Sequence, residues 1–364
     1  MPLMTKTVVD FVCARGAEPF LVPAMGSHGG ATAEGQVDIL RSLGITEEAM
    51  GCKIYSDMDP ILLGEANGLP LYQDRYAAQA DGIILLNRVK MHTGFRGHYE
   101  SGLLKMLAVG LGKEKGAETC HAAGEDELGR RIEQIGLALL NRSKVILGVA
   151  LLENAYDQTF DLEVVPAEEI AEREPTLLIR AKEHMGKLFL ESCDVLIVKN
   201  IGKNYSGAGT DPNIVGRCAN PKLKSGIRCR RMGFLDLSEE SHGNAVGIGR
   251  ADICSKRLYE KMDFDQTYPN FMACKAVATF KIPIVAESNE DVLKACIFTC
   301  INIDQQRPRV VLIDNSLEID SYLVSEALLP EVGELDKISV EGEAVRLTFD
   351  EKGKLLTRIR IGQG

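Results

Sequence analysis

Residues 82–112, GIILLNRVKMHTGFRGHYESGLLKMLAVGLG, give the clearest indication of how this chain folds. The segment begins with an apolar run over Gly82–Leu86, which is typical of a short strand. It continues through a polar loop and ends in an apolar helical pattern over Gly102–Leu111. A strand followed by a loop and a helix is the repeating unit of parallel α/β sheets. The polar loop should therefore lie at the carboxyl end of a strand, where open α/β sheets bind ligands.

The rest of the first half repeats this alternation. Two more strands are expected, over Phe20–Met25 and Val145–Leu152. Helical patterns span Lys6–Ala14, Ala33–Leu43, Asp126–Asn141 and Glu168–His184, the last interrupted by Pro175. A parallel sheet normally opens with a strand before its first helix, so the pattern predicts a domain that lacks this first N-terminal strand.

The second half contains a new set of α/β patterns. Strands are expected over Val195–Val198 and Val310–Ile313, and helices near Ile253–Met262 and Glu290–Cys300. The tail alternates apolar and polar residues over Ile338–Phe349 and Leu355–Ile361, which predicts a hairpin turning at residues 352–354. The sequence thus predicts two α/β domains, 1–187 and 188–364, with mostly parallel sheets and an active-site cleft between them.

Composition excludes several classes of function. The chain has 364 residues, 45% hydrophobic and 26% charged, which is typical of a globular protein. A net charge of -10 makes nucleic acid and anionic membranes poor partners. No apolar run approaches the ~18 residues of a membrane span. The ten cysteines form no CxxC motif and no signal peptide precedes them, so we expect free thiols and a cytoplasmic protein of undetermined oligomeric state.

Lys105 is the only charged residue between Gly102 and Gly112. Burying an ammonium group is costly and lowers its pKa, so a lysine in such a run tends to be partly neutral and nucleophilic. Gly102 lets the backbone approach a ligand closely. This part of the chain predicts a reactive amine in a ligand site.

A second candidate site follows the strand expected at Phe20–Met25. His28 follows this strand after Gly26 and Ser27, and Gly29 and Gly30 precede a helix whose N-terminus favours anions. We expect His28 to act as an acid or base and the two glycines to line a bound ligand. The alternative is an ordinary loop histidine.

The loop of the opening segment carries further histidines. His92 follows Arg88 and Lys90 at a spacing of two, so the three side chains share one direction if the strand continues. His92 facing His28 across a small substrate would give a two-base site, which suits racemisation because chemistry occurs on both faces of one carbon. Arg96 and His98 are candidate substrate contacts. Surface histidines in a polar loop are the alternative.

His121 lies sixteen residues after Lys105. A histidine can bind a metal through one ring nitrogen, but no acidic or thiol cluster surrounds His121 at ligand spacing. If a metal binds here, most of its ligands must come from something other than the protein.

A glycine-rich loop over residues 202–217 follows the strand expected at Val195–Val198. Lys203 and Arg217 are candidate contacts for a polar substrate, because a guanidinium can hold a carboxylate through paired hydrogen bonds. A tight structural loop is the alternative.

These residues together resemble the nickel-dependent lactate racemase family, most strongly over residues 23–124. The resemblance implies that His28 and His92 are the paired acid and base, that Lys105 is the covalent tether of the cofactor, and that His121 is the only protein ligand of the metal. The implied cofactor is the nickel-pincer nucleotide, nickel pyridinium-3,5-bisthiocarboxylic acid mononucleotide, made by dedicated biosynthetic enzymes. The implied reaction is reversible hydride transfer from the α-carbon of a small 2-hydroxy acid.

The chain departs from the family pattern in two ways. The loop between His92 and Lys105 is longer, with His98, Tyr99 and Glu100 inserted, which predicts altered substrate or cofactor use. Family members also carry an arginine on an earlier strand that grips the substrate carboxylate. Either the start of the chain is truncated, or another arginine replaces it, or the chain is not catalytic as it stands. The candidates are Arg88, Arg96 and Arg217.

Three functions follow from these residues. The first is a racemase or epimerase of lactate or a larger hydroxy or sugar acid. The second is a zinc- or iron-dependent hydrolase or lyase that uses His28, His92 and His121. The third is a non-catalytic cofactor-binding protein.

Overall fold

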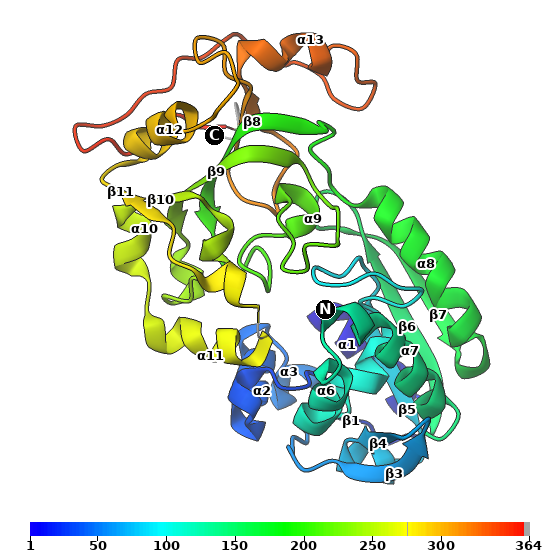
Figure 1. The fold of residues 1–364 in the computed structure, drawn as a ribbon. Helices are drawn as coiled ribbons and strands as arrows, with labels where there is room; N and C mark the ends of the chain where they lie inside the picture. The colour runs from blue at the N-terminus through cyan, green and yellow to red at the C-terminus, as the bar shows by residue number, and fades with distance from the viewer. Residues whose placement is uncertain (275, 360–364) are drawn as a thin grey trace. The chain divides into compact units, whose positions relative to one another are not determined.

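The computed structural model describes residues 1–274 and 276–359. They form two compact units, each with its own hydrophobic core (Figure 1). The first unit comprises Met1–Glu153 and Thr159–His184, and the second comprises Asn154–Gln158 and the described part of Met185–Gly364. No helix in the described part of the chain is long and apolar enough to cross a membrane.

The first unit combines short strands with eight α-helices among its described residues. Its strands are β1 (Phe20–Leu21), β2 (Lys53–Ile54), β3 (Ile61–Ala66), β4 (Leu69–Gln73), β5 (Ile83–Arg88), β6 (Val145–Glu153) and β7 (Thr159–Pro166). Its α-helices are α1 (Pro2–Cys13), α2 (Ala33–Ser42), α3 (Glu47–Met50), α4 (Arg75–Gln79), α5 (Leu103–Lys105), α6 (Lys113–His121), α7 (Glu125–Leu140) and α8 (Ile170–His184). Short 3₁₀ turns form η1 (Gly29–Ala31) and η3 (Ala167–Glu169), and η2 (Met106–Gly110) is a π-helix.

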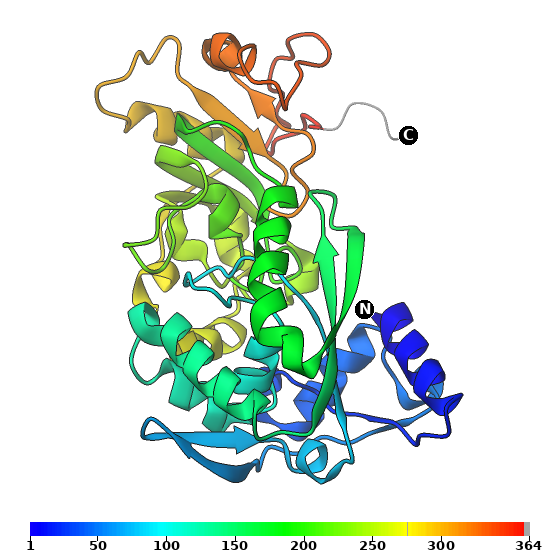
Figure 2. The same ribbon diagram turned by 90° about the vertical axis from the view of Figure 1, so that its right-hand side faces the viewer.

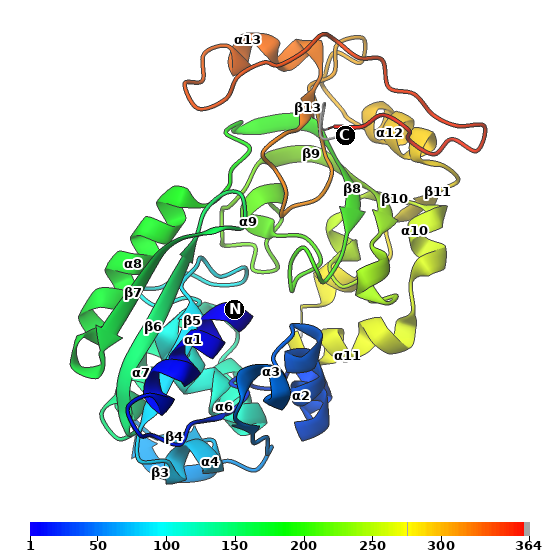
Figure 3. The ribbon, with the colours of Figure 1, turned by 180° about the vertical axis from the view of Figure 1, so that it is seen from behind.

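The main sheet of the first unit has the order β5-β6-β7. β5 and β6 are parallel, whereas β7 returns antiparallel to β6. Helix α8 packs along β6 and β7, as the bright green helix and strands of Figure 2 show. β1 pairs in parallel with β2, and β3 forms a hairpin with β4 that is visible in Figure 3.

The core of the first unit surrounds the segment formed by α5 and η2. Leu103, Leu104 and Leu107 are completely buried. They belong to one cluster with apolar side chains of β5, β6, α7 and α8. A helix that is apolar on all sides must lie inside a domain, which explains why this run of sequence became central.

The second unit is built on one six-stranded sheet of order β11-β10-β9-β8-β12-β13. Its strands are β8 (Ser192–Ile201), β9 (Arg228–Leu237), β10 (Ile253–Ser255), β11 (Ile284–Ala286), β12 (Val310–Ile313) and β13 (Leu323–Val324). All neighbours are parallel except β12 and β13. Its α-helices are α9 (Pro212–Val215), α10 (Lys256–Lys261), α11 (Phe264–Cys274), α12 (Asn289–Phe298) and α13 (Leu329–Val332). Its 3₁₀ turns are η4 (Glu239–Ser241), η5 (Ile248–Arg250), η6 (Val277–Phe280) and η7 (Glu326–Leu328).

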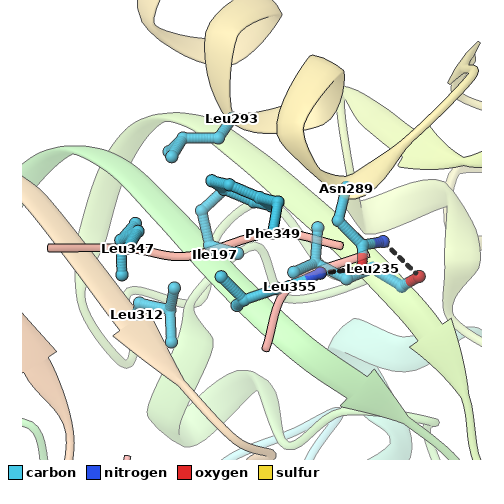
Figure 4. A pocket seen from close by; sticks show the side chains of 8 residues that line it. All are labelled: Ile197, Leu235, Asn289, Leu293, Leu312, Leu347, Phe349 and Leu355. Atoms are coloured by element: carbon cyan, nitrogen blue, oxygen red, sulfur yellow. Dashed lines mark hydrogen bonds between the residues drawn. The ribbon is translucent and has the colours of Figure 1, made fainter. Parts of the chain in front are cut away.

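The two faces of this sheet carry separate apolar clusters. One contains Leu258 of α10, and the other contains Val292 of α12, so the unit has three layers. The C-terminal segment closes the second face, where Phe349 and Leu355 lie over the sheet (Figure 4). Asn289 joins the segment to the sheet, because it accepts the Leu355 N–H at 3.0 Å and donates to the Leu235 carbonyl at 3.2 Å. The α/β class with mostly parallel sheets is therefore confirmed.

Several predicted boundaries were wrong. The strand expected over Phe20–Met25 ends at Leu21, because β1 has only the two-residue β2 to pair with. Residues 253–255 form β10 rather than the start of a helix, and the Ser255 hydroxyl caps α10 by accepting the Leu258 N–H. The helix expected over 102–111 is divided into α5 and the π-helix η2.

The predicted C-terminal hairpin is reduced to one antiparallel bridge between Phe349 and Leu355, and residues 360 and 361 lie outside the described residues. The antiparallel strand β7 and the β3–β4 hairpin were not predicted. The hairpin has a sequence signal, since Asn67-Gly68 is a favoured two-residue turn.

Candidate active site

Lys105 ends α5 and is half-buried. Its pKa falls to about 8, first because the ammonium group loses hydration and then because Lys90 is positively charged; Cys120 opposes the shift. An amine with this pKa is partly neutral near pH 7 and can act as a nucleophile. The expectation of a lysine with a lowered pKa is therefore met by its surroundings.

His121 is the last residue of α6 and is exposed. The chain reverses between η2 and α6 through Gly112, where a Cβ would lie 2.6 Å from the Ala108 carbonyl oxygen. Only a glycine permits this close approach. The reversal brings α6 against η2, so that the residues after Lys105 return toward it.

His92 lies within electrostatic range of Lys105 and of His121. The pKa of His92 is held well below its ordinary value of 6.5, first by burial. The charges of Lys105, His121, Arg96 and Lys90 lower it further, in that order. All four residues expected to carry the chemistry belong to the first unit, and two of them, Lys105 and His121, act electrostatically on His92. The excess of positive charge suits a ligand that carries a carboxylate or a phosphate.

The ring of His92 is held in one orientation. Its Nδ1 accepts the Gly94 N–H at 2.9 Å, and the ring packs on Phe95 with 4.2 Å between the centroids. Because Nδ1 is an acceptor, the neutral imidazole carries its proton on Nε2. The backbone is fixed as well, since the His92 N–H donates to Glu100 Oε2 at 2.7 Å and its carbonyl accepts from Arg96.

Tyr99 and Glu100, which the family resemblance predicts to be an insertion, anchor this loop to α8. The Tyr99 hydroxyl donates to the Ala171 carbonyl at 2.7 Å. Glu100 is only 1% exposed, and its Oε1 lies 2.6 Å from Lys182 Nζ. The sequence marked these residues as an insertion but gave no sign that they support His92. The contacts of Tyr99 and Glu100 therefore fix the loop in place.

Arg96 and His98 are not placed as free substrate contacts. The Arg96 guanidinium donates to the carbonyls of His92 and Phe95, and it lies 3.7 Å from Glu100. His98 has an 80% exposed side chain, with Nδ1 3.6 Å from Glu133 Oε1. For His98, the alternative of a surface histidine fits the structure.

His28 precedes η1 and is exposed. Its N–H donates to the Met25 carbonyl at 3.1 Å. Gly29 and Gly30 both have positive φ, of 69° and 66°, which explains the two glycines without a ligand. A Cβ on Gly29 would overlap the backbone of Gly35, whereas Gly30 faces open space. Of these two glycines, Gly30 is therefore the one with open space beside its Cα for a ligand.

A buried polar group that the sequence did not reveal supports the His28 loop. Gln36 Nε2 donates to the carbonyls of Gly26 at 2.8 Å and His28 at 3.3 Å. Lys113 Nζ donates to Gln36 Oε1 at 3.3 Å and to the Pro23 carbonyl at 2.7 Å. Lys113 was missed because Glu114 and Lys115 follow it, and a run of charges is typical of a surface.

Arg217 belongs to the second unit, where its guanidinium is engaged internally. It lies 2.6 Å from Asp252 Oδ2 and donates to the carbonyls of Arg250 and Arg230. These contacts argue against the predicted role as a carboxylate clamp. Lys203 Nζ donates to Asn270 Oδ1 at 2.8 Å and to the Gly207 carbonyl at 3.2 Å.

Within residues 1–274 and 276–359, no three His, Cys, Asp or Glu side chains are arranged to hold a metal ion. A catalytic zinc site normally uses three protein ligands. The predicted site of His28, His92 and His121 for zinc or iron is therefore not assembled in this part of the chain. A single histidine could serve only a metal whose other ligands come from a cofactor.

No model of a known protein family matches the sequence, and no curated protein has significant sequence similarity to it. Solved structures do share its fold. A crystal structure of a Thermotoga maritima protein has a TM-score of 0.50 at 13% identity and covers 86% of this chain and 89% of its own. The lactate racemase apoprotein from Thermoanaerobacterium thermosaccharolyticum has a TM-score of 0.52 at 12% identity, covering 87% and 83%. The chain has a lactate racemase-like fold.

Proposed function

We propose that this protein is a racemase or epimerase of a 2-hydroxy acid, either lactate or a larger hydroxy or sugar acid. The observation that carries the proposal is the electrostatic grouping of His92, Lys105 and His121 in the first unit. The similarity of the fold to a lactate racemase apoprotein supports it. The Lys105–His121 spacing is that of the tether and metal ligand in the family that the sequence resembles.

The residues present fit a nickel-pincer nucleotide. Lys105, with a pKa of about 8, offers the neutral amine needed to form an amide-type bond. His121 is exposed at the end of α6 and can give one imidazole nitrogen to a metal. When bound, the cofactor would supply a hydride acceptor. The positive charges of Lys90 and Arg96 would attract the substrate carboxylate.

His92 would act as a hydrogen-bond donor to the substrate. Its Nδ1 is occupied by the Gly94 N–H, so the neutral ring presents Nε2–H. This N–H group can donate a hydrogen bond to the substrate oxygen while the 2-keto carbonyl forms. It can donate again when that carbonyl is reduced. His28 would be the partner that accepts the hydroxyl proton, because its exposed ring can exchange protons with water.

The test is the metal content and intact mass of the protein after co-expression with the cofactor-making enzymes. We expect one nickel per chain and an added mass located on Lys105. The Lys105→Ala variant should show no adduct, and His28→Ala should keep the adduct while losing racemisation. A nickel-free protein of unmodified mass would refute the proposal.

Two other outcomes are informative. Bound zinc or iron without an organic adduct would favour a hydrolase or lyase. An adduct without exchange of the substrate α-deuterium would favour a cofactor-binding protein. A panel of hydroxy acids of three to six carbons would identify the substrate.

A further inference from the structure

Helix α8 places one carboxylate inside the core of the first unit. Glu174 is 1% exposed, and its Oε1 has no hydrogen-bond partner within the described residues. A buried carboxylate is costly unless its oxygens are used. The oxygens of Glu174 are therefore expected to have a partner inside the core.

Glu174 contacts the N-terminus of α5. Its Oε2 accepts the Leu104 N–H at 2.9 Å, and the Leu103 N–H also favours the ionised carboxylate. Helix N-termini have backbone N–H groups without an intrahelical partner, and water cannot satisfy them in a core. Glu174 thus caps a helix from another helix, seventy residues later in the chain.

Gly102 makes this cap possible. It is the residue before α5, and a Cβ at this position would overlap Oε1 of Glu174. Its carbonyl accepts from Asn87 Nδ2 at 3.1 Å, so the start of the helix is held from both sides. The structure gives Gly102 a packing reason, and its role as a cofactor contact stays a prediction.

We propose that Glu174 is a positioning residue for Lys105: its carboxylate seats the first turn of α5 and thereby keeps the Lys105 amine buried and reactive. Lys105 directly follows Leu104, whose N–H the carboxylate binds. If that bond were lost, the turn would fray and Lys105 would gain hydration. The proposal goes beyond the function above, since it concerns the amine whether or not a cofactor is attached.

The charges around Glu174 are few. Burial raises its pKa to about 7, against the effect of the Leu104 and Leu103 N–H groups. The titratable neighbour whose pKa Glu174 affects is Tyr99. Burial raises the pKa of Tyr99 first, and the negative charges of Glu133 and Glu174 raise it further. Lys105 owes its own shift mainly to lost hydration. Glu174 therefore acts on Lys105 through position rather than through charge.

The experiment measures acetylation of Lys105 by acetic anhydride in the apoprotein from pH 6 to 10, quantified by peptide mass spectrometry. Exposed Lys337 serves as the internal reference. We compare Glu174→Gln, which keeps the reach and an acceptor oxygen, with Glu174→Asp, which keeps the charge but is shorter. Glu172→Ala, an exposed site on the same helix, is the matched control.

We expect Glu174→Asp to raise the apparent pKa of Lys105 by one unit or more, which lowers labelling at pH 7 by about tenfold per unit. Glu174→Gln and Glu172→Ala should keep the wild-type profile. Gly102→Ala should behave like Glu174→Asp, because its methyl group displaces the carboxylate without changing Glu174. Circular dichroism confirms that each variant is folded.

Unchanged Lys105 profiles in folded Glu174→Asp and Gly102→Ala would overturn the proposal, since a purely structural role would alter thermal stability alone. A raised pKa in Glu174→Gln, with none in Glu174→Asp, would also overturn it, because charge would then be the cause. The assay contains no nickel or nucleotide, so its result is independent of the proposed racemase function.

Discussion

Lys113 Nζ lies 3.1 Å from Asp74 Oδ2, and neither side chain is accessible to solvent. Asp74 Oδ1 caps α4 by accepting the Ala77 N–H, and Lys113 also binds the Pro23 carbonyl before the His28 loop. The pair therefore joins α4, α6 and the chain leading to His28. Removing one partner would leave the other buried and uncompensated.

We expect Lys113→Met to lower the free energy of unfolding by about 3–5 kcal/mol, the usual cost of breaking a buried pair. Urea denaturation would measure it. Lys115→Met is the matched control, because Lys115 pairs with Asp59 on the surface at 50% and 64% exposure. Its effect should stay below about 0.5 kcal/mol. Equal stabilities of the two variants would contradict this account.

Gln36 should support the His28 loop. Gln36→Met removes the donor to the Gly26 and His28 carbonyls, and we expect a loss of about 2 kcal/mol. Hydrogen exchange of the amides of residues 28–32 should accelerate more than exchange elsewhere in the first unit. Gln79→Met, at an exposed position, is the control. Unchanged exchange in the loop would show that Gln36 does not hold it.

The sequence predicted those parts of the fold and site that depend on local pattern. The strand and apolar helix around the histidine loop were found because burial on all sides leaves an uninterrupted apolar run. The division of that helix into α5 and η2 was not predicted, and neither was the close packing of a distant residue against its end. A Cβ on Gly110 would lie 2.6 Å from the carbonyl oxygen of Ala24.

The supporting residues were missed for a related reason. Glu174 and Lys113 look like surface charges in their local sequence, and only partners seventy and thirty-nine positions away bring them inside. Arg217 was expected to bind substrate because its partner Asp252 lies thirty-five residues later. The local sequence around Arg217 therefore does not show that its guanidinium is already paired. Local sequence reveals which side chains can do chemistry, but it does not reveal which are already engaged.

Arg217 should matter for stability rather than for substrate affinity. We expect Arg217→Met to reduce stability by about 2–4 kcal/mol, because it leaves Asp252 and two carbonyl groups without their donor. Arg228→Met is the control, since its pair with Glu191 is 76% and 87% exposed. If KM for the hydroxy acid rises sharply while stability is unchanged, Arg217 binds substrate after all.

Glu174 should make stability depend on pH. Its folded pKa of about 7 lies above the ordinary value of 4.5, so its contribution is fully present below pH 4.5 and is lost as the pH rises through 7. Relative to wild type, Glu174→Gln should gain about 3 kcal/mol of stability between pH 4.5 and 8. Denaturation at several pH values measures this difference. A constant difference would mean that the carboxyl is not perturbed.

His92 should remain neutral, with its proton on Nε2, through the physiological pH range. Burial and the charges of Lys105 and His121 hold its pKa well below 6.5, and the Gly94 N–H occupies Nδ1. Nitrogen-15 spectra of the histidine rings report the tautomer and its titration directly. In Lys105→Met the pKa of His92 should rise, because a cation that disfavours the imidazolium has been removed. The exposed control Lys144→Met should leave it unchanged. A proton found on Nδ1 at pH 7 would instead make Nε2 a base, and the donor role assigned to His92 would pass to another group.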